Sequence, residues 1–202
     1  MQSLSTPEPD EPGGPSGPPV ATDTPKRGGR DTVRVAFEWV GLVVLALIIA
    51  LLIKTFLFQA FYIPSESMVP TLKVHDRVLV NKLSYKLHSV HRGDIVVFKA
   101  PAGSDPGIDD LVKRVIGLPG ETVEAHGGHV YVDKKELKES YLPAGTSTSD
   151  FAPVKIPPNA YWVMGDNRGN SKDSRVFGTI AKSKIVGRVF VRIWPFSRLG
   201  FM

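Results

Sequence analysis

The pattern of apolar and polar positions divides the chain into three stretches. Residues 1–30 contain almost no apolar side chains and show no periodicity. Residues 39–53 are fifteen consecutive positions without a charge, so a helix there is apolar on every face. From residue 64 onward, short segments alternate apolar and polar positions with a period of two, which is typical of half-buried β-strands.

Seven segments of the third stretch have this alternation and are predicted to be strands. They cover residues 77–81, 94–98, 111–116, 122–125, 129–132, 161–164 and 185–193. Gly127 and Gly128 separate two of them, as in a tight hairpin. We expect no further helix beyond the apolar run. The predicted fold class is therefore mostly β, an antiparallel β-sheet domain on a single N-terminal transmembrane helix.

The apolar run has the length of a membrane-spanning helix. Residues 35–53 include one charge, that of Glu38, and nineteen residues of helix extend over roughly 28 Å, close to the thickness of a bilayer's hydrocarbon core. The alternatives are a buried helix of a soluble protein and a cleaved signal peptide. The preceding segment is long for a signal peptide, and residues 58–60, Phe-Gln-Ala, do not form an A-x-A cleavage site.

Basic residues before the span set its expected orientation. Lys26, Arg27, Arg30 and Arg34 place the N-terminal side in the cytoplasm by the positive-inside rule. The expected organisation is a disordered cytoplasmic tail over residues 1–34, a transmembrane signal anchor over residues 35–54 and an extracytoplasmic domain over residues 55–202.

Four aromatic residues lie just after the span: Phe56, Phe58, Phe61 and Tyr62. Aromatic rings at this place fit a membrane–water interface. They equally fit the first core strand of the following domain, and the two interpretations are compatible.

Composition narrows the possible chemistry. The chain has no cysteine, which excludes disulfide scaffolds, thiolate zinc sites and cysteine nucleophiles. Its five histidines include two His-x-x-His pairs, at residues 88 and 91 and at residues 126 and 129. No carboxylate completes a ligand set at a suitable spacing, so we expect surface histidines and no metal. Seven of the 17 prolines and five of the 19 glycines fall in residues 1–30, which indicates disorder there.

A proline-bracketed turn is the first candidate for chemistry. Ser65 and Ser67 lie between Pro64 and Pro70, and such a turn can hold a hydroxyl group rigidly. The alternative is a linker turn with capping serines.

Lys113 is the second candidate. Strand alternation places it on one face with Leu111 and Val115, so that a buried face would carry a cation into the core. A solvated edge strand is the alternative. Only about one lysine in 2,500 is neutral at pH 7 with an ordinary pKa, and burial lowers that pKa enough to make a usable base.

The polar loop at residues 165–175 is the third candidate. Its alternating acidic and basic residues indicate either a solvated loop or one locked by Asp–Arg pairing. Arg168 stands where an EF-hand needs an oxygen ligand, so a calcium loop is excluded.

Taken in order along the chain, the serine turn, the segment that begins at Lys113 and the polar loop resemble three sequence boxes of bacterial type I signal peptidases. These are the membrane-anchored leader peptidases with a Ser-Lys dyad. The similar segments are residues 64–72, 113–121 and 165–178. Glu66 and Glu121 depart from the family's usual Gly and Asp, and neither position belongs to the dyad.

The resemblance implies a role for each residue of the site. Ser67 would be the nucleophile, Lys113 the general base, Ser65 an oxyanion-hole donor and Ser171 the residue that orients the Lys113 amine. Ion pairs would brace the site, and Met68 would line the S1 pocket. The bracing residues are Arg114, Asp166, Asp173 and Arg175.

The resemblance also implies the substrate and partners. The enzyme would cleave exported preproteins after small residues, typically Ala-x-Ala, at the outer face of a bacterial cell membrane, with no cofactor. The expected partners are these preproteins and the lipid bilayer.

Three alternative functions remain open. The first is a peptidase with few substrates, such as a pilin-maturation enzyme. The second is a peptide-binding module without catalytic activity, and the third is a self-cleaving regulator. The regulator needs a DNA-binding domain, for which residues 1–30 are too short, so no nucleic-acid partner is expected.

Overall fold

The N-terminal helix carries the apolar run. The computed structural model describes residues 29–102, 104 and 107–202. Helix α1 spans Gly29–Phe56, and its stretch Val33–Leu52 has a mean hydropathy of 2.7 and is long enough to cross a bilayer. The side chains of this stretch are exposed, which does not fit the alternative of a buried core helix. Residues 1–28 of the tail predicted to be disordered lie outside the described residues. Residues 29–34, which were included in that tail, instead form the first turns of α1, so the prediction of disorder is wrong for them.

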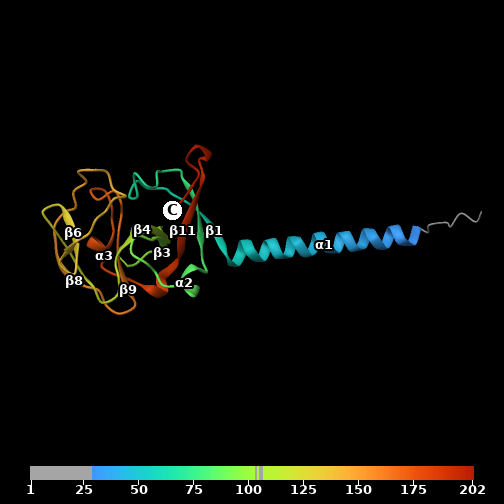
Figure 1. The fold of residues 1–202 in the computed structure, drawn as a ribbon, viewed down its shortest axis with the longest axis horizontal. Helices are drawn as coiled ribbons and strands as arrows, with labels where there is room; N and C mark the ends of the chain where they lie inside the picture. Colours follow the sequence, from blue (N-terminus) through green and yellow to red (C-terminus); the bar gives the residue numbers. More distant parts are fainter. Residues whose placement is uncertain (1–28, 103, 105–106) are drawn as a thin grey trace, which may run out of the picture. The chain divides into compact units, whose positions relative to one another are not determined.

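The strands form two antiparallel sheets (Figure 1). The 8-stranded sheet has the order β1-β2-β11-β3-β4-β9-β10, with β12 paired to β11. Its strands are β1 (Phe58–Tyr62), β2 (Arg77–Asn81), β3 (Ile95–Lys99), β4 (Asp110–Gly117), β9 (Ala160–Met164), β10 (Ile180–Ala181), β11 (Ile185–Trp194) and β12 (Gly200–Phe201). The 4-stranded sheet has the order β7-β6-β5-β8. Its strands are β5 (Thr122–His126), β6 (His129–Val132), β7 (Lys135–Glu136) and β8 (Phe151–Lys155).

The predicted fold class is confirmed. Each of the seven predicted strands is present with ends shifted by one residue at most, and His126 pairs with His129 across the expected hairpin. The segment after the span forms β1, in which Phe61 packs against the core. Strands β7, β8, β10 and β12 were not predicted, because three of them are only two residues long and β8 contains Pro153.

Two short helices contradict the expectation of no helix beyond the apolar run. They are α2 (Ser84–Leu87) and α3 (Ser174–Phe177), each four residues long. A single turn is too short to show a helical period in the sequence. Asp173 caps α3 by accepting a hydrogen bond from the Arg175 N–H, so the turn is set by a local side-chain contact.

The 8-stranded sheet is buried on both faces at its centre. In β3, Ile95 and Val97 belong to one core cluster, whereas Val96 and Phe98 belong to another. Lys113 pairs with Val96 of β3 and is only 3% exposed, so its interpretation as part of a solvated edge strand is wrong. The sheet therefore carries this lysine into the interior of the domain.

Candidate active site

The serine turn is fixed by buried side chains on its C-terminal side. The Val69 N–H donates to the Glu66 carbonyl and the Leu72 N–H donates to the Met68 carbonyl. Met68 and Leu72 are fully buried in the cluster beside β2 and β3. Burying these two apolar side chains anchors the turn, so that the half-exposed Ser67 hydroxyl has a defined position.

Lys113 meets Ser67 at this turn. Its Nζ lies 2.7 Å from Ser67 Oγ and 3.0 Å from the Val112 carbonyl oxygen. The Ser65 and Ser67 hydroxyl oxygens are 3.3 Å apart. The three side chains that were predicted to react or to hold the oxyanion therefore lie at one place.

Burial changes the acid–base behaviour of Lys113, which is 3% exposed. Desolvation lowers its pKa from 10.5 to about 8, although the negative charges of Asp173 and Asp166 act in the opposite direction. With a pKa near 8, roughly one molecule in ten carries a neutral amine at pH 7. A neutral amine can accept a proton from the serine hydroxyl.

The loop after β9 closes over the serine turn. The Asn167 N–H donates to the Ser67 carbonyl, and Asn167 Nδ2 donates to the Glu66 carbonyl. At Gly165 there is no room for a Cβ atom, which would collide with the Ser67 carbonyl oxygen and with Ser171. A glycine is needed here because the two loops touch backbone to backbone.

Two buried ion pairs support this loop. Arg114 forms a bidentate pair with Asp166 at 2.8 and 2.6 Å, and Thr71 donates to the same carboxylate at 2.5 Å. Asp173 pairs with Arg175 at 2.8 Å and accepts from the Gly165 N–H. Burial raises the pKa of Asp173, but the hydrogen bonds and charge of Arg175, together with the Gly165 N–H, hold it below its usual range.

Ser171 does not occupy the place expected of it. Its hydroxyl is buried and makes no hydrogen bond in the described structure, so the predicted bond to the Lys113 amine is absent. The hydroxyl instead lies beside Gly165 and close enough to Asp173 to help lower the pKa of that carboxyl. The Lys113 amine is oriented by Ser67 and by its neighbour's carbonyl.

Sequence reasoning missed a second set of contacts around Arg114. Its guanidinium lies 3.9 Å from the ring centre of Tyr141, and Tyr141 donates to Glu139. Glu139 also receives two hydrogen bonds from the buried Arg168, at 2.5 and 2.6 Å. Residues 139 and 141 lie in a segment without periodic patterning, and only the fold brings them to the site.

A shallow cleft lies in front of the serine. A cavity of about 250 Å³ is lined by Ser67, Lys113 and Ile108, among others. Next to it is a smaller cavity of about 70 Å³, and Met68 is among the residues that line it. Among the described residues no group of three His, Asp or Glu side chains is placed to hold a metal ion.

Comparisons with known proteins agree on one family. Residues 36–194 match the family described as "Signal peptidase, peptidase S26". The chain is 45% identical over 161 residues to a probable signal peptidase I-2 of Synechocystis sp., covering 79% of this chain and 73% of the relative. It is 40% identical over 175 residues to signal peptidase I S of Bacillus subtilis, covering 80% and 91% respectively. A crystal structure of a signal peptidase I from Enterococcus faecalis aligns with 50% of this chain and 97% of its own, at 31% identity and a TM-score of 0.44.

Replacing Lys113 by Met should raise the free energy of unfolding at about pH 7 by up to about 3 kcal/mol, because it removes a buried ammonium group. Between pH 8 and pH 10.5, the lysine is protonated in the unfolded chain and largely neutral in the folded chain, because its pKa is about 8 when folded and 10.5 when unfolded. The unfolded chain therefore binds more protons, and the stability of the wild type rises with pH in this range. The gain from Lys113→Met should therefore be largest below pH 8 and shrink above it. Thermal unfolding of the full chain in detergent checks both points.

Lys135→Met is the matched control, since Lys135 is exposed on the 4-stranded sheet. This variant should leave the melting temperature unchanged. If Lys113→Met is no more stable than the wild type at neutral pH, Lys113 does not bear the desolvation cost assigned to it.

Proposed function

Because the chain belongs to the signal peptidase S26 family, its activity is the removal of signal peptides, and we propose that it cleaves them with Ser67 as nucleophile and Lys113 as general base. The observation that supports this proposal best is the distance of 2.7 Å between Lys113 Nζ and Ser67 Oγ, in a site where burial lowers the pKa of the lysine. A serine hydroxyl is a weak nucleophile without an adjacent base, and a neutral amine supplies one.

The proposed reaction has two halves. Neutral Lys113 removes the Ser67 proton as Oγ attacks the scissile carbonyl carbon, and the resulting ammonium then gives that proton to the leaving amine of the mature protein. The signal peptide stays attached to Ser67 as an ester. A water molecule, deprotonated by the same lysine, hydrolyses the ester and restores the free serine.

The developing oxyanion needs hydrogen-bond donors. We assign them to the Ser67 N–H and the Ser65 hydroxyl, which lies 3.3 Å from the attacking oxygen. Donors aimed at a developing negative charge contribute about 3–4 kcal/mol each in such sites. The rigidity of the serine turn keeps both donors in place before the substrate arrives.

The cleft also favours a particular cleavage sequence. Its walls come from residues 61–65, which run on from β1, and from residues 108–113 at the start of β4. An extended peptide between these segments could form main-chain hydrogen bonds as an added strand. The cavity of about 70 Å³ beside Met68 has room for roughly two water molecules, so it suits the methyl group of Ala and excludes a large side chain. This supports cleavage after Ala-x-Ala.

Membrane placement follows from the chain order. Helix α1 would span the bilayer with its basic N-terminal flank in the cytoplasm. Ser67 follows Phe56, the last residue of that helix, by 11 residues, so the cleavage site would lie close to the outer surface of the membrane. The signal peptide's own apolar segment holds its cleavage site at the same depth.

Substitution of either dyad residue should abolish preprotein cleavage. Ser67→Ala removes the nucleophile, and Lys113→Arg keeps a cation that cannot be deprotonated in proteins. The double variant should be no slower than either single variant, because the two side chains act as one unit. Cleavage of a labelled preprotein by the full chain in vesicles measures this. Substantial activity in Lys113→Arg would exclude the lysine as the base.

Ser65→Ala should slow turnover by about 10²–10³-fold while leaving KM nearly unchanged, because an oxyanion donor acts only in the transition state. Ser104→Ala serves as a control serine outside the cleft. Steady-state kinetics on one preprotein separates the two parameters. A rate within about twofold of the wild type would remove Ser65 from the oxyanion hole.

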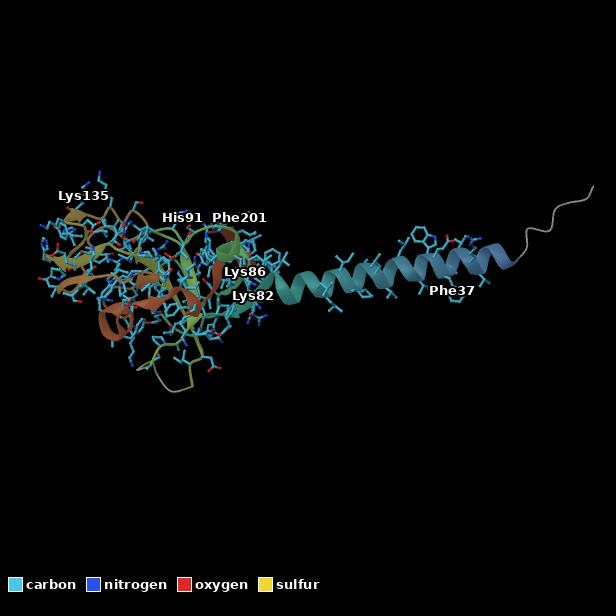
Figure 2. All side chains as sticks on the ribbon, turned by 90° about the horizontal axis from the view of Figure 1, so that it is seen from below. Phe37, Lys82, Lys86, His91, Lys135 and Phe201 are labelled. Atoms are coloured by element: carbon cyan, nitrogen blue, oxygen red, sulfur yellow. The ribbon has the colours of Figure 1, made fainter. Side chains whose placement is uncertain are left out.

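Exposed rings near the C-terminus should bind lipid independently of the helix. Trp194, Phe196 and Phe201 are 46%, 74% and 87% exposed, so they do not fill the core (Figure 2 labels Phe201). The domain without residues 1–54 should therefore sediment with lipid vesicles. The single variants Trp194→Ala and Phe196→Ala should each weaken the partitioning of this domain into vesicles by roughly tenfold. Circular dichroism must show that the variants stay folded.

Val176→Ala is the matched control for the rings, since Val176 is an apolar side chain of α3 that is 63% exposed. Its removal should not change partitioning. If the wild-type domain stays in the supernatant, α1 alone attaches the protein to the membrane.

A further inference from the structure

A groove at the C-terminal end of β2 lies outside the candidate active site and has a strongly basic lining. It has a volume of about 360 Å³. Its lining residues come from the position just after β2, from α2, from the 3-10 turn Lys182–Lys184 and from the start of β11. They are Lys82, Tyr85, Lys86, Lys182, Ser183, Ile185 and Val186. We call this the lysine groove.

The lysine groove has three cations and no acidic residue in its lining. Lys86 and Lys182 are exposed, and neither side chain makes an ion pair with any carboxylate of the described ranges. Like charges this close repel one another over distances shorter than the Debye length, roughly 8–10 Å in physiological salt. Binding an anion would relieve this repulsion, and the Ser183 hydroxyl supplies a further donor.

The chain fixes how far this groove is from the membrane. The Lys82 N–H donates to the carbonyl of Leu57 at 2.9 Å. Leu57 comes five residues after Leu52, where the apolar stretch ends, which is roughly 8 Å along a helix axis. The polar headgroups occupy about 5–8 Å on each side of the hydrocarbon core, so Lys82 would lie at headgroup depth.

We propose that the lysine groove binds the phosphate of an anionic phospholipid in the outer leaflet, with Lys86 and Lys182 as its cationic ligands. The proposal rests on the membrane anchoring given under the proposed function. Ile185 and Val186 give the groove an apolar side that suits the glycerol and acyl part of a lipid better than a free phosphate ion. Figure 2 shows Lys82 and Lys86 close to each other.

The lysine groove and the exposed rings mark the two ends of one pair of strands. Asn81, which precedes Lys82, pairs with Arg188 of β11, whereas Arg77 at the other end of β2 pairs with Trp194 of the same strand. Four residue steps of a strand correspond to roughly 13 Å. Headgroup binding at one end and ring insertion at the other would lay this edge of the sheet along the bilayer surface, with the serine turn beside it.

Native mass spectrometry of the full chain in neutral detergent micelles tests the proposal. Titration with phosphatidylglycerol should show tighter binding than titration with phosphatidylcholine. In Lys86→Gln/Lys182→Gln the tightest phosphatidylglycerol step should weaken by roughly fivefold per lysine, or about 25-fold. The matched control is Lys135→Gln/Lys138→Gln, two exposed lysines near β7, on the 4-stranded sheet; it should bind as the wild type does.

Three results would overturn the proposal. The first is unchanged phosphatidylglycerol binding in Lys86→Gln/Lys182→Gln, and the second is an equal loss in the control variant. The third is displacement of the lipid by inorganic phosphate at constant ionic strength, which would make the groove a site for a soluble anion. Preprotein cleavage in phosphatidylcholine vesicles is measured in parallel. If the wild type binds phosphatidylglycerol but does not cleave the preprotein, the result contradicts the proposed function and does not affect the proposal that the groove binds lipid.

Discussion

The burial of one ammonium group is the constraint on which the site depends. Lys113 sits on an interior strand, and the surrounding protein removes it from water so far that its pKa falls to about 8. The nearby carboxylates of Asp166 and Asp173 act against this by raising the pKa, although each is itself paired with an arginine. The site therefore pairs its negative charges with arginines, and desolvation brings the pKa of the lysine close to physiological pH.

The same pairing sets the geometry of the two loops that meet at the serine. Arg114, next to the lysine on β4, holds Asp166 in the loop after β9, and Asp166 in turn accepts a hydrogen bond from Thr71 in the serine turn. Removing one partner of such a buried pair costs about 3–5 kcal/mol. One carboxylate, that of Asp166, thus holds the strand, the turn and the loop together, which gives the arginine that follows the buried lysine a structural role.

The sequence was informative where chemistry and local pattern coincide. Two prolines around Ser67 and a lysine within an alternating apolar strand marked both residues as candidates, with a linker turn and a solvated edge strand as the alternatives. Their roles as a dyad came from the resemblance to signal peptidases. Tyr141 and Glu139 could not be named, because their contacts with the site depend on how the segment between β7 and β8 folds back. The position of the Ser171 hydroxyl was equally beyond the pattern, since it depends on the close approach of Gly165 to the serine turn.

The pH dependence of a single turnover tests the central claim most directly. With the full chain in excess over a labelled preprotein, the cleavage rate should rise about tenfold per pH unit below the lysine pKa and level off near pH 8. That profile would show that the neutral form of a buried lysine carries the reaction. A rate that is flat from about pH 6 to 9, or that continues to rise toward the ordinary lysine pKa of about 10.4, would contradict it.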